Sequence, residues 1–268
     1  MRHRRNDRTY ILAFQSRPPF DDQGRTQSAE APENLHARTA RSVGLLALII
    51  SAGFFIILPF SATVSAAEGG QLAANGNSNG APACSACHGD QGEGRPDAAY
   101  PRLAGLNSGY LLRQPNDFAD KKRESETMQP IAKGLGMDER TAVSSFYGGL
   151  SAPKVQEPKK PDDKTLAIGA ALALRGDWSK GLPGCGQCHG PGGQGVGDSF
   201  PKLAAQSAEY IVKELKAWRE GKRGNDPLNL MTGIASKLDE AQMAAVAAYY
   251  ASLPVVTSAS AGQKGTKP

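Results

Sequence analysis

The stretch GCGQCHGPGGQG, Gly184 to Gly195, decides how this chain is interpreted. Two cysteines stand three positions apart, a histidine follows directly, and glycines follow the histidine. A related stretch, ACSACHGDQGEG, runs from Ala83 to Gly94, so the same unit occurs twice. The two units contain all four cysteines of the 268-residue chain, which leaves none for a structural disulfide elsewhere.

The similarity between the two copies extends well beyond the cysteines. Tyr100-Pro101-Arg102-Leu103 recurs as Phe200-Pro201-Lys202-Leu203, at an offset of 100. The matching continues downstream, where Tyr110, Phe118, Lys122-Arg123 and Met128 correspond to Tyr210, Trp218, Lys222-Arg223 and Met231. The sequence therefore predicts two copies of one domain, over residues 68–150 and 164–255. The Pro-rich segment 151–163 is predicted to link them.

The segments outside the repeat have the composition of targeting and tail sequences. Residues 1–41 are polar and Arg-rich, and we interpret them as a disordered leader. Residues 42–67 carry no charge and fit either a cleaved signal peptide, with small residues at Val64-Ser65-Ala66, or a retained membrane anchor. Both alternatives predict a periplasmic protein, soluble or anchored to the inner membrane. The small, polar tail 256–268 is expected to be disordered.

The repeat itself has a helical pattern. Ile211, Leu215 and Trp218 fall at i, i+4 and i+7, and no alternating strand pattern is present. Acidic pairs at residues 138–139 and 239–240 suit the first turns of the final helices. The sequence therefore predicts an all-α fold. Pro115 stands where the second copy has Leu215, which predicts a helix broken or restarted after Gln114.

Three chemistries use a C-x-x-C-H unit. A zinc site needs four ligands, usually from two cysteine pairs close in sequence, whereas each repeat offers two thiols and one imidazole. A redox dithiol of the thioredoxin type needs a strand–helix context, which the pattern does not show. Covalent haem attachment uses both thiols for the vinyl groups and places the histidine beneath the iron. Two copies in register favour haem, and a large apolar cofactor would also suit a chain with only 6% aromatic residues.

A haem iron held by His88 or His189 needs a sixth ligand in each repeat. The other histidines, His3 and His36, precede the predicted export segment. Methionine is the alternative, and Met137 and Met243 have no methionine opposite them in the repeat. Only Met128 and Met231 correspond to each other. The sequence thus predicts two covalently attached haem c groups, with iron ligands His88, Met128, His189 and Met231 and thioether cysteines Cys84, Cys87, Cys185 and Cys188.

Other residues are candidates for supporting each haem. Pro101 and Pro201 are expected to supply the carbonyl that accepts a hydrogen bond from the ligating histidine. Arg123 and Arg223 are candidates for pairing with the haem propionates. The expected apolar walls of the two haem sites are Tyr100, Leu103 and Phe118 in the first copy and Phe200, Leu203 and Trp218 in the second.

With these motifs in place, the chain resembles class I cytochrome c domains, and two in tandem after an export signal resemble the dihaem cytochrome c4 family. CSACHG, CGQCHG, the Tyr/Phe-Pro-Arg/Lys-Leu element and the two methionines carry the resemblance. It implies an all-α fold in each half and a carrier of single electrons. It also implies redox protein partners, passing electrons from a quinol-oxidising complex to a terminal oxidase.

His/Met ligation leaves no open iron position, so we expect an electron carrier and not an enzyme. Two alternatives stay open: a cytochrome subunit of a periplasmic dehydrogenase, and a dihaem peroxidase, which the paired methionines disfavour. The charge is uneven, with an excess of two acidic residues over 68–158 and of four basic residues over 159–268, which could orient partners. No basic stripe interleaved with aromatic residues indicates nucleic-acid binding.

Overall fold

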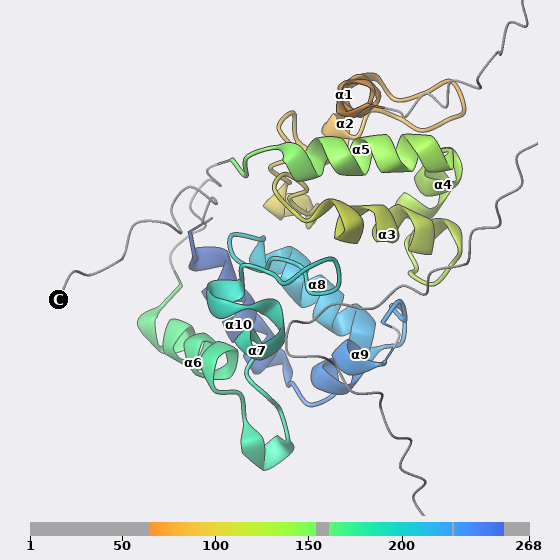
Figure 1. Ribbon diagram of the computed structural model, residues 1–268. Helices are drawn as coiled ribbons and strands as arrows, with labels where there is room; N and C mark the ends of the chain where they lie inside the picture. The colour runs from red at the N-terminus through yellow and green to blue at the C-terminus, as the bar shows by residue number, and fades with distance from the viewer. Residues whose placement is uncertain (1–64, 154–160, 227, 255–268) are drawn as a thin grey trace, which may run out of the picture. The chain divides into compact units, whose positions relative to one another are not determined.

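The computed structural model describes residues 65–153, 161–226 and 228–254. The first half contains α1 (Ala66–Asn75), α2 (Ser85–His88), η1 (Pro96–Ala98), α3 (Ser108–Ala119), α4 (Met128–Lys133) and α5 (Met137–Gly149). The second contains α6 (Asp163–Leu174), η2 (Trp178–Lys180), α7 (Gly186–His189), η3 (Pro191–Gly193), α8 (Ala208–Arg219), α9 (Leu230–Ala235) and α10 (Glu240–Ser252). Figure 1 shows these elements in chain order.

The two halves repeat the same order of helices, which confirms the predicted duplication. The helices α1 to α5 correspond in turn to α6 to α10, and α3 and α8 are offset by 100 residues at both ends. Within the described ranges, β-type pairing is limited to isolated bridges, so the all-α prediction is also confirmed. The acidic pairs lie where expected, since Asp138 and Glu139 are in the first turn of α5 and Asp239 caps α10.

Several predicted segments lie outside the described residues. These are the leader 1–41, most of the apolar segment 42–67, the middle of the linker and the tail 256–268. The helix α1 begins at Ala66 with Ser65 as its cap, inside the segment proposed as signal or anchor. In the part of the chain that the structure covers, no helix has the length and apolar character needed to cross a bilayer.

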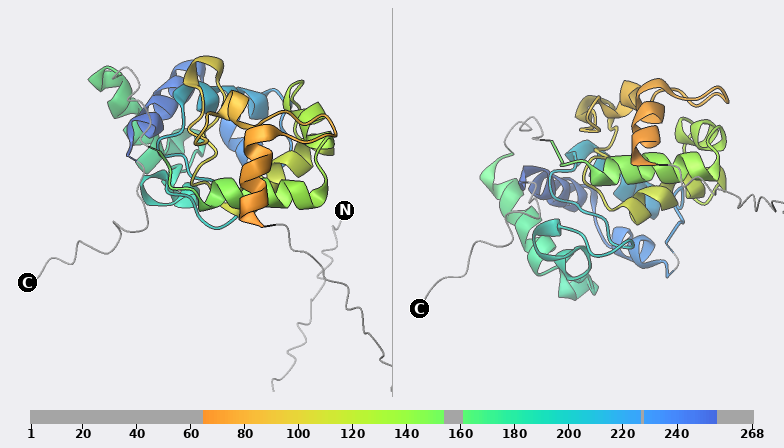
Figure 2. Two further views of the ribbon diagram at one scale, coloured as in Figure 1. Left: turned by 90° about the horizontal axis from the view of Figure 1, so that it is seen from above. Right: turned by 45° about the horizontal axis from the view of Figure 1, so that its top comes forward.

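The first and last helices of each half cross closely because glycine occupies the point of contact. A Cβ atom on Gly69 would lie 2.2 Å from the carbonyl oxygen of Ala142, and one on Gly169 would lie 2.1 Å from that of Ala245. No other residue permits this approach of two backbones. The crossing of α1 over α5 is visible in Figure 2. Each crossing supports the short helix with the C-x-x-C-H unit that follows α1 or α6.

The prediction about Pro115 is wrong, because α3 runs without a break from Ser108 to Ala119. A proline inside a helix costs about 3 kcal/mol through a lost hydrogen bond and a steric clash. Tertiary contacts offset this cost, since residues on both sides of the proline are buried, among them Leu111 and Phe118. Asn107 also caps the helix by accepting a hydrogen bond from the N–H of Tyr110.

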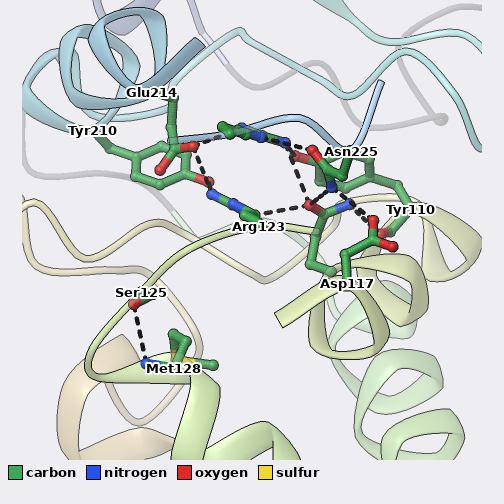
Figure 3. A network of polar contacts seen from close by, with 10 residues as sticks. Tyr110, Asp117, Arg123, Ser125, Met128, Tyr210, Glu214 and Asn225 are labelled. Atoms are coloured by element: carbon green, nitrogen blue, oxygen red, sulfur yellow. Dashed lines mark hydrogen bonds and ion pairs between the residues drawn. The ribbon is translucent and has the colours of Figure 1, made fainter. Parts of the chain in front are cut away.

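A buried cluster of charged and polar side chains joins the two halves. Arg123 and Arg223 both reach the Glu214 carboxylate, each with an N–O distance of 2.7 Å. Each arginine also donates to the tyrosine of the opposite half, Arg123 to Tyr210 at 2.9 Å and Arg223 to Tyr110 at 3.3 Å. Figure 3 shows Arg123 between Tyr210, Glu214 and the residues of α3. One carboxylate therefore balances two buried guanidinium groups.

Aromatic rings and amides complete this cluster. The Arg123 guanidinium lies 4.6 Å from the centre of the Phe118 ring, and that of Arg223 lies 4.5 Å from the Trp218 ring. Both distances fit cation–π attraction. The side-chain oxygen of Gln114 accepts hydrogen bonds from both arginines and from Asn225. Gln114 is the repeat counterpart of Glu214, so the pseudo-symmetric cluster carries its shared carboxylate on one side only.

Removing the shared carboxylate should strongly destabilise the protein. E214A leaves two buried arginines without their shared counter-charge, so we expect a loss of about 3–5 kcal/mol in unfolding free energy, measured by urea titration. The control is E220A, because Glu220 pairs with Lys222 at the exposed surface. That variant should change stability by less than about 1 kcal/mol. Equal losses in both variants would contradict a structural role for the cluster.

The same carboxylate should make stability depend on pH. Burial acts to raise the pKa of Glu214, but Arg123 and Arg223 outweigh it and hold the pKa below its ordinary value. A depressed carboxyl contributes stability that is fully present above the unfolded pKa of about 4.3 and is lost as the pH falls through the folded pKa. The stability difference between wild type and E214Q should therefore be constant at neutral pH and shrink below about pH 4.3. A difference that grows on acidification would count against this assignment.

Candidate functional site: two haem attachment helices

Each C-x-x-C-H unit forms a one-turn helix that glycine ends. The N–H of His88 donates to the carbonyl of Cys84 at 2.9 Å, and that of His189 donates to Cys185 at the same distance. The next residues, Gly89 and Gly190, have φ values of 82° and 77°, which side chains rarely adopt. The turn thus fixes the backbone that carries two thiols and one imidazole, and a sharp change in chain direction follows it.

A backbone carbonyl fixes each histidine. His88 Nδ1 donates to the Pro101 carbonyl at 2.9 Å, and His189 Nδ1 donates to the Pro201 carbonyl at 2.8 Å. This confirms the predicted role of the two prolines. The bond selects the tautomer whose Nε2 carries a lone pair, as a metal ligand requires. Burial also lowers the pKa of both imidazoles, which favours the neutral form.

The cysteines do not have the environment of a redox dithiol. No disulfide joins any of the four to another. Burial raises the pKa of the Cys84 and Cys185 thiols, whereas reactive dithiols have a lowered cysteine pKa. Within the described ranges, no three His, Cys, Asp or Glu side chains are grouped closely enough to hold a metal ion. These observations favour covalent haem attachment over the dithiol and zinc alternatives.

The candidate methionines differ clearly in their surroundings. Met128 is the first residue of α4, and Met231 is the second residue of α9, so both lie at the start of short helices. Both are partly buried. Met243 is fully buried within α10, and Met137 is 58% exposed at the start of α5. A side chain that meets a bound haem should be partly buried in the protein alone, which favours Met128 and Met231.

Hydrogen bonds hold the backbone at both candidate methionines. The N–H of Met128 donates to the Ser125 hydroxyl at 3.0 Å, as Figure 3 shows. The N–H of Met231 donates to the Asp226 carboxylate at 2.5 Å. Each bond satisfies a donor at the start of a helix, where no carbonyl of the same helix is available. The sequence signal for these caps was the Ser or Asp a few residues before each methionine.

The described residues fit a haem in each half. Each histidine has a buried ring whose Nδ1 is used by the proline carbonyl, which leaves Nε2 for iron. The centre of the His88 ring lies 6.2 Å from that of Tyr100, and the centre of the His189 ring lies 6.1 Å from that of Phe200. Phe118 and Trp218 are buried, and Leu103 and Leu203 pack against the core clusters of their halves. Arg123 and Arg223 have a different partner from the predicted propionates, because Glu214 engages both.

Sequence reasoning missed the residues that connect the halves, above all Glu214, Gln206 and buried Arg102. The available signal was the set of positions at which the two repeats differ. Glu214 stands opposite Gln114, and Gln206 stands opposite Leu106. A charged residue aligned with an amide, or an amide aligned with an aliphatic residue, indicates a role that only one half performs.

Comparison with known proteins agrees with this site. The Cytochrome c family model matches the chain twice, over residues 66–147 and 169–254. The thiosulfate dehydrogenase electron acceptor of Thiomonas intermedia (strain K12) is 46% identical over 184 residues, covering 69% of this chain and 84% of that protein. Cytochrome c4 of Thiocapsa roseopersicina is 35% identical over 185 residues, covering 68% of this chain and 90% of that protein.

A solved structure shows the same architecture. The thiosulfate dehydrogenase TsdBA of Marichromatium purpuratum, in its as-isolated form, superposes with a TM-score of 0.67 at 38% identity. The match covers 72% of this chain but only 41% of that longer chain. Similarity to this structure therefore extends to one part of the TsdBA chain.

The tandem helical domains and the two matches define the class: the chain belongs to the cytochrome c family. Its paired C-x-x-C-H units and its relatives make it a dihaem cytochrome of the cytochrome c4 type. It binds two haem c groups covalently and transfers electrons. Each bound haem supplies an iron that gains and loses one electron, and the chain supplies the thiols, the oriented imidazoles and the apolar walls.

The individual ligands stay predictions, and spectroscopy can test them. M128A and M231A should each abolish the long-wavelength Fe–S band at one haem, about half of the total absorbance, because each removes one sulfur ligand. M243L is the control, since the side chain of Met243 on α10 lies in the hydrophobic core of the second half. It should leave the band unchanged. If M128A and M231A both left the band intact, the assignment of the sixth ligands would be wrong.

Proposed function

We propose that this dihaem cytochrome accepts electrons from a thiosulfate dehydrogenase and passes them to a respiratory acceptor. The observation that carries the proposal is the 46% identity to a thiosulfate dehydrogenase electron acceptor over 84% of its length. The identity to cytochrome c4 of Thiocapsa roseopersicina is lower, at 35% over a similar length. This proposal develops the dehydrogenase-subunit alternative that the sequence left open.

The TsdBA structure supports the same partner. A segment similar to this chain makes up 41% of a single chain that bears the name of the enzyme. Similarity to a segment of an enzyme chain supports an exchange of electrons with that kind of enzyme. We infer that a separate carrier with the same architecture has the same exchange partner, reached by docking instead of by a peptide link.

The protein's own role is that of a carrier and not of the dehydrogenase. Two methionines at corresponding, partly buried positions would close the sixth iron position in each half, which suits electron transfer and disfavours substrate binding at iron. Each iron stores one electron, so the oxidised chain takes up two. We place this exchange in the periplasm, with residues 42–67 acting as a cleaved signal or as an anchor to the inner membrane.

A second candidate function has a specific observation in its favour. The relatives include cytochromes c4, and the resemblance to that family implies a carrier between a quinol-oxidising complex and a terminal oxidase. The two candidates differ in the electron donor. Rapid mixing with each donor therefore separates them.

The test is reduction of the oxidised protein by a thiosulfate dehydrogenase. We expect thiosulfate with catalytic amounts of the enzyme to reduce both haems, two electrons per chain, with second-order kinetics that slow as salt is added. Thiosulfate alone should leave the protein oxidised, because two irons with closed sixth positions would offer thiosulfate no place to bind. The control donor is a quinol-oxidising complex with its quinol. Faster reduction by that complex than by the dehydrogenase would replace the first proposal with the second.

A further inference from the structure

The peptide unit between Pro101 and Arg102 is hydrogen-bonded on both sides. Its carbonyl accepts from His88 Nδ1 at 2.9 Å. Its N–H donates to the side-chain oxygen of Gln206 at 2.9 Å. Gln206 belongs to the second half, and only 4% of its surface is exposed. A continuous path therefore runs from an amide in the second half, through one peptide group, to the imidazole of the first haem site.

Further hydrogen bonds fix the part of this path at Gln206 and Arg102. The Gln206 amide nitrogen donates to the Arg102 carbonyl at 3.1 Å, so the side-chain amide is hydrogen-bonded to both the N–H and the C=O of Arg102. The Arg102 guanidinium, 1% exposed, donates to the carbonyls of Ala204 at 3.0 Å, Ala205 at 3.3 Å and Ala104 at 2.5 Å. The segment that carries Gln206 is thus tied to the segment that orients His88 at several points.

The second haem site lacks this connection. The repeat counterpart of Gln206 is Leu106, which has no polar atom and packs in the core of the first half. The peptide between Pro201 and Lys202 therefore receives no side-chain bond from that position, although its carbonyl holds His189 in the same way. The two histidines have equal direct partners and unequal support behind those partners.

We propose that Gln206 is a positioning residue of the first haem, supplied by the second half, and that it lowers the reduction potential of that haem. A hydrogen bond accepted from a peptide N–H polarises the peptide, which makes its carbonyl a stronger acceptor. A stronger acceptor at Pro101 increases electron donation by the His88 imidazole, and a more basic ligand stabilises the oxidised iron. The proposal rests on ligation by His88 and is independent of the identity of the electron donor.

The test replaces the amide with a thioether of similar volume. In Q206M the reduction equilibrium of the first haem should shift about threefold toward the reduced state, or about 28 mV for a one-electron couple. The second haem should keep its potential. The measurement is a potentiometric titration followed in the visible spectrum, and M128A identifies the step that belongs to the first haem. The M128A spectrum also tests ligation separately from the role of Gln206.

Two further variants separate tuning from loosening of the interface. Q206E keeps an acceptor for the Arg102 N–H, so the first potential should return to the wild-type value or fall below it. N225A removes side-chain bonds from Asn225 to Gln114 and Asp117 across the same interface without touching the Pro101–Arg102 peptide. It should leave the first potential unchanged. An unchanged first potential in Q206M, equal shifts at both haems, or an upward shift in Q206E or N225A would overturn the proposal.

Discussion

The hydrogen bond from each haem-site histidine to a proline carbonyl is the interaction on which the rest of the structure depends. It selects the ring nitrogen that can face iron and holds the ring in one orientation. Forming it requires the chain to turn back sharply after the attachment helix, which explains Gly89 and Gly190 at positive φ. Proline has no backbone N–H and a restricted φ, so at these two positions it offers only a carbonyl acceptor, held by a stiff backbone.

Duplication places two such sites in one chain, and the interface between the halves then makes them unequal. Arg123 and Arg223 occupy equivalent positions and reach the same carboxylate, because Glu214 has only the neutral Gln114 as its counterpart. A second carboxylate there would place two like charges close together in a buried site. A single carboxylate shared by two arginines, with an amide opposite, satisfies the donors with less repulsion. The exchange of tyrosine contacts makes each half depend on the other.

The arrangement also has consequences for electron transfer. A carrier that holds two electrons functions best when its sites keep a fixed relation, since small changes in geometry and electrostatics alter the exchange between them. The buried cluster of side chains and the bonds from the Gln206 amide to the Arg102 backbone provide such a constraint. Both connections lie in segments that follow the attachment helices, so the elements that build a haem site also build the interface.

Local rules succeeded where a short motif determines local geometry. The proline acceptors and the paired acidic helix starts follow from residues close in sequence and were predicted. The same rules failed at Pro115, because burial of Leu111 and Phe118 stabilises a helix that the local sequence disfavours. The same rules failed at Arg123 and Arg223, which were predicted to pair with haem propionates. Both contact Glu214 on α8 instead, and Arg123 does so from the opposite half.

The sequence by itself determined the duplication, the all-α class and the chemistry of the cofactor, since these depend on residue types at short, repeated spacings. Only the tertiary structure decided how the halves are joined and which residues make them different. The physical reason is that a buried charge or amide acquires its role from the groups that replace water around it. Glu214 contacts Arg123, 91 residues away in the sequence, and Gln206 contacts Arg102, 104 residues away.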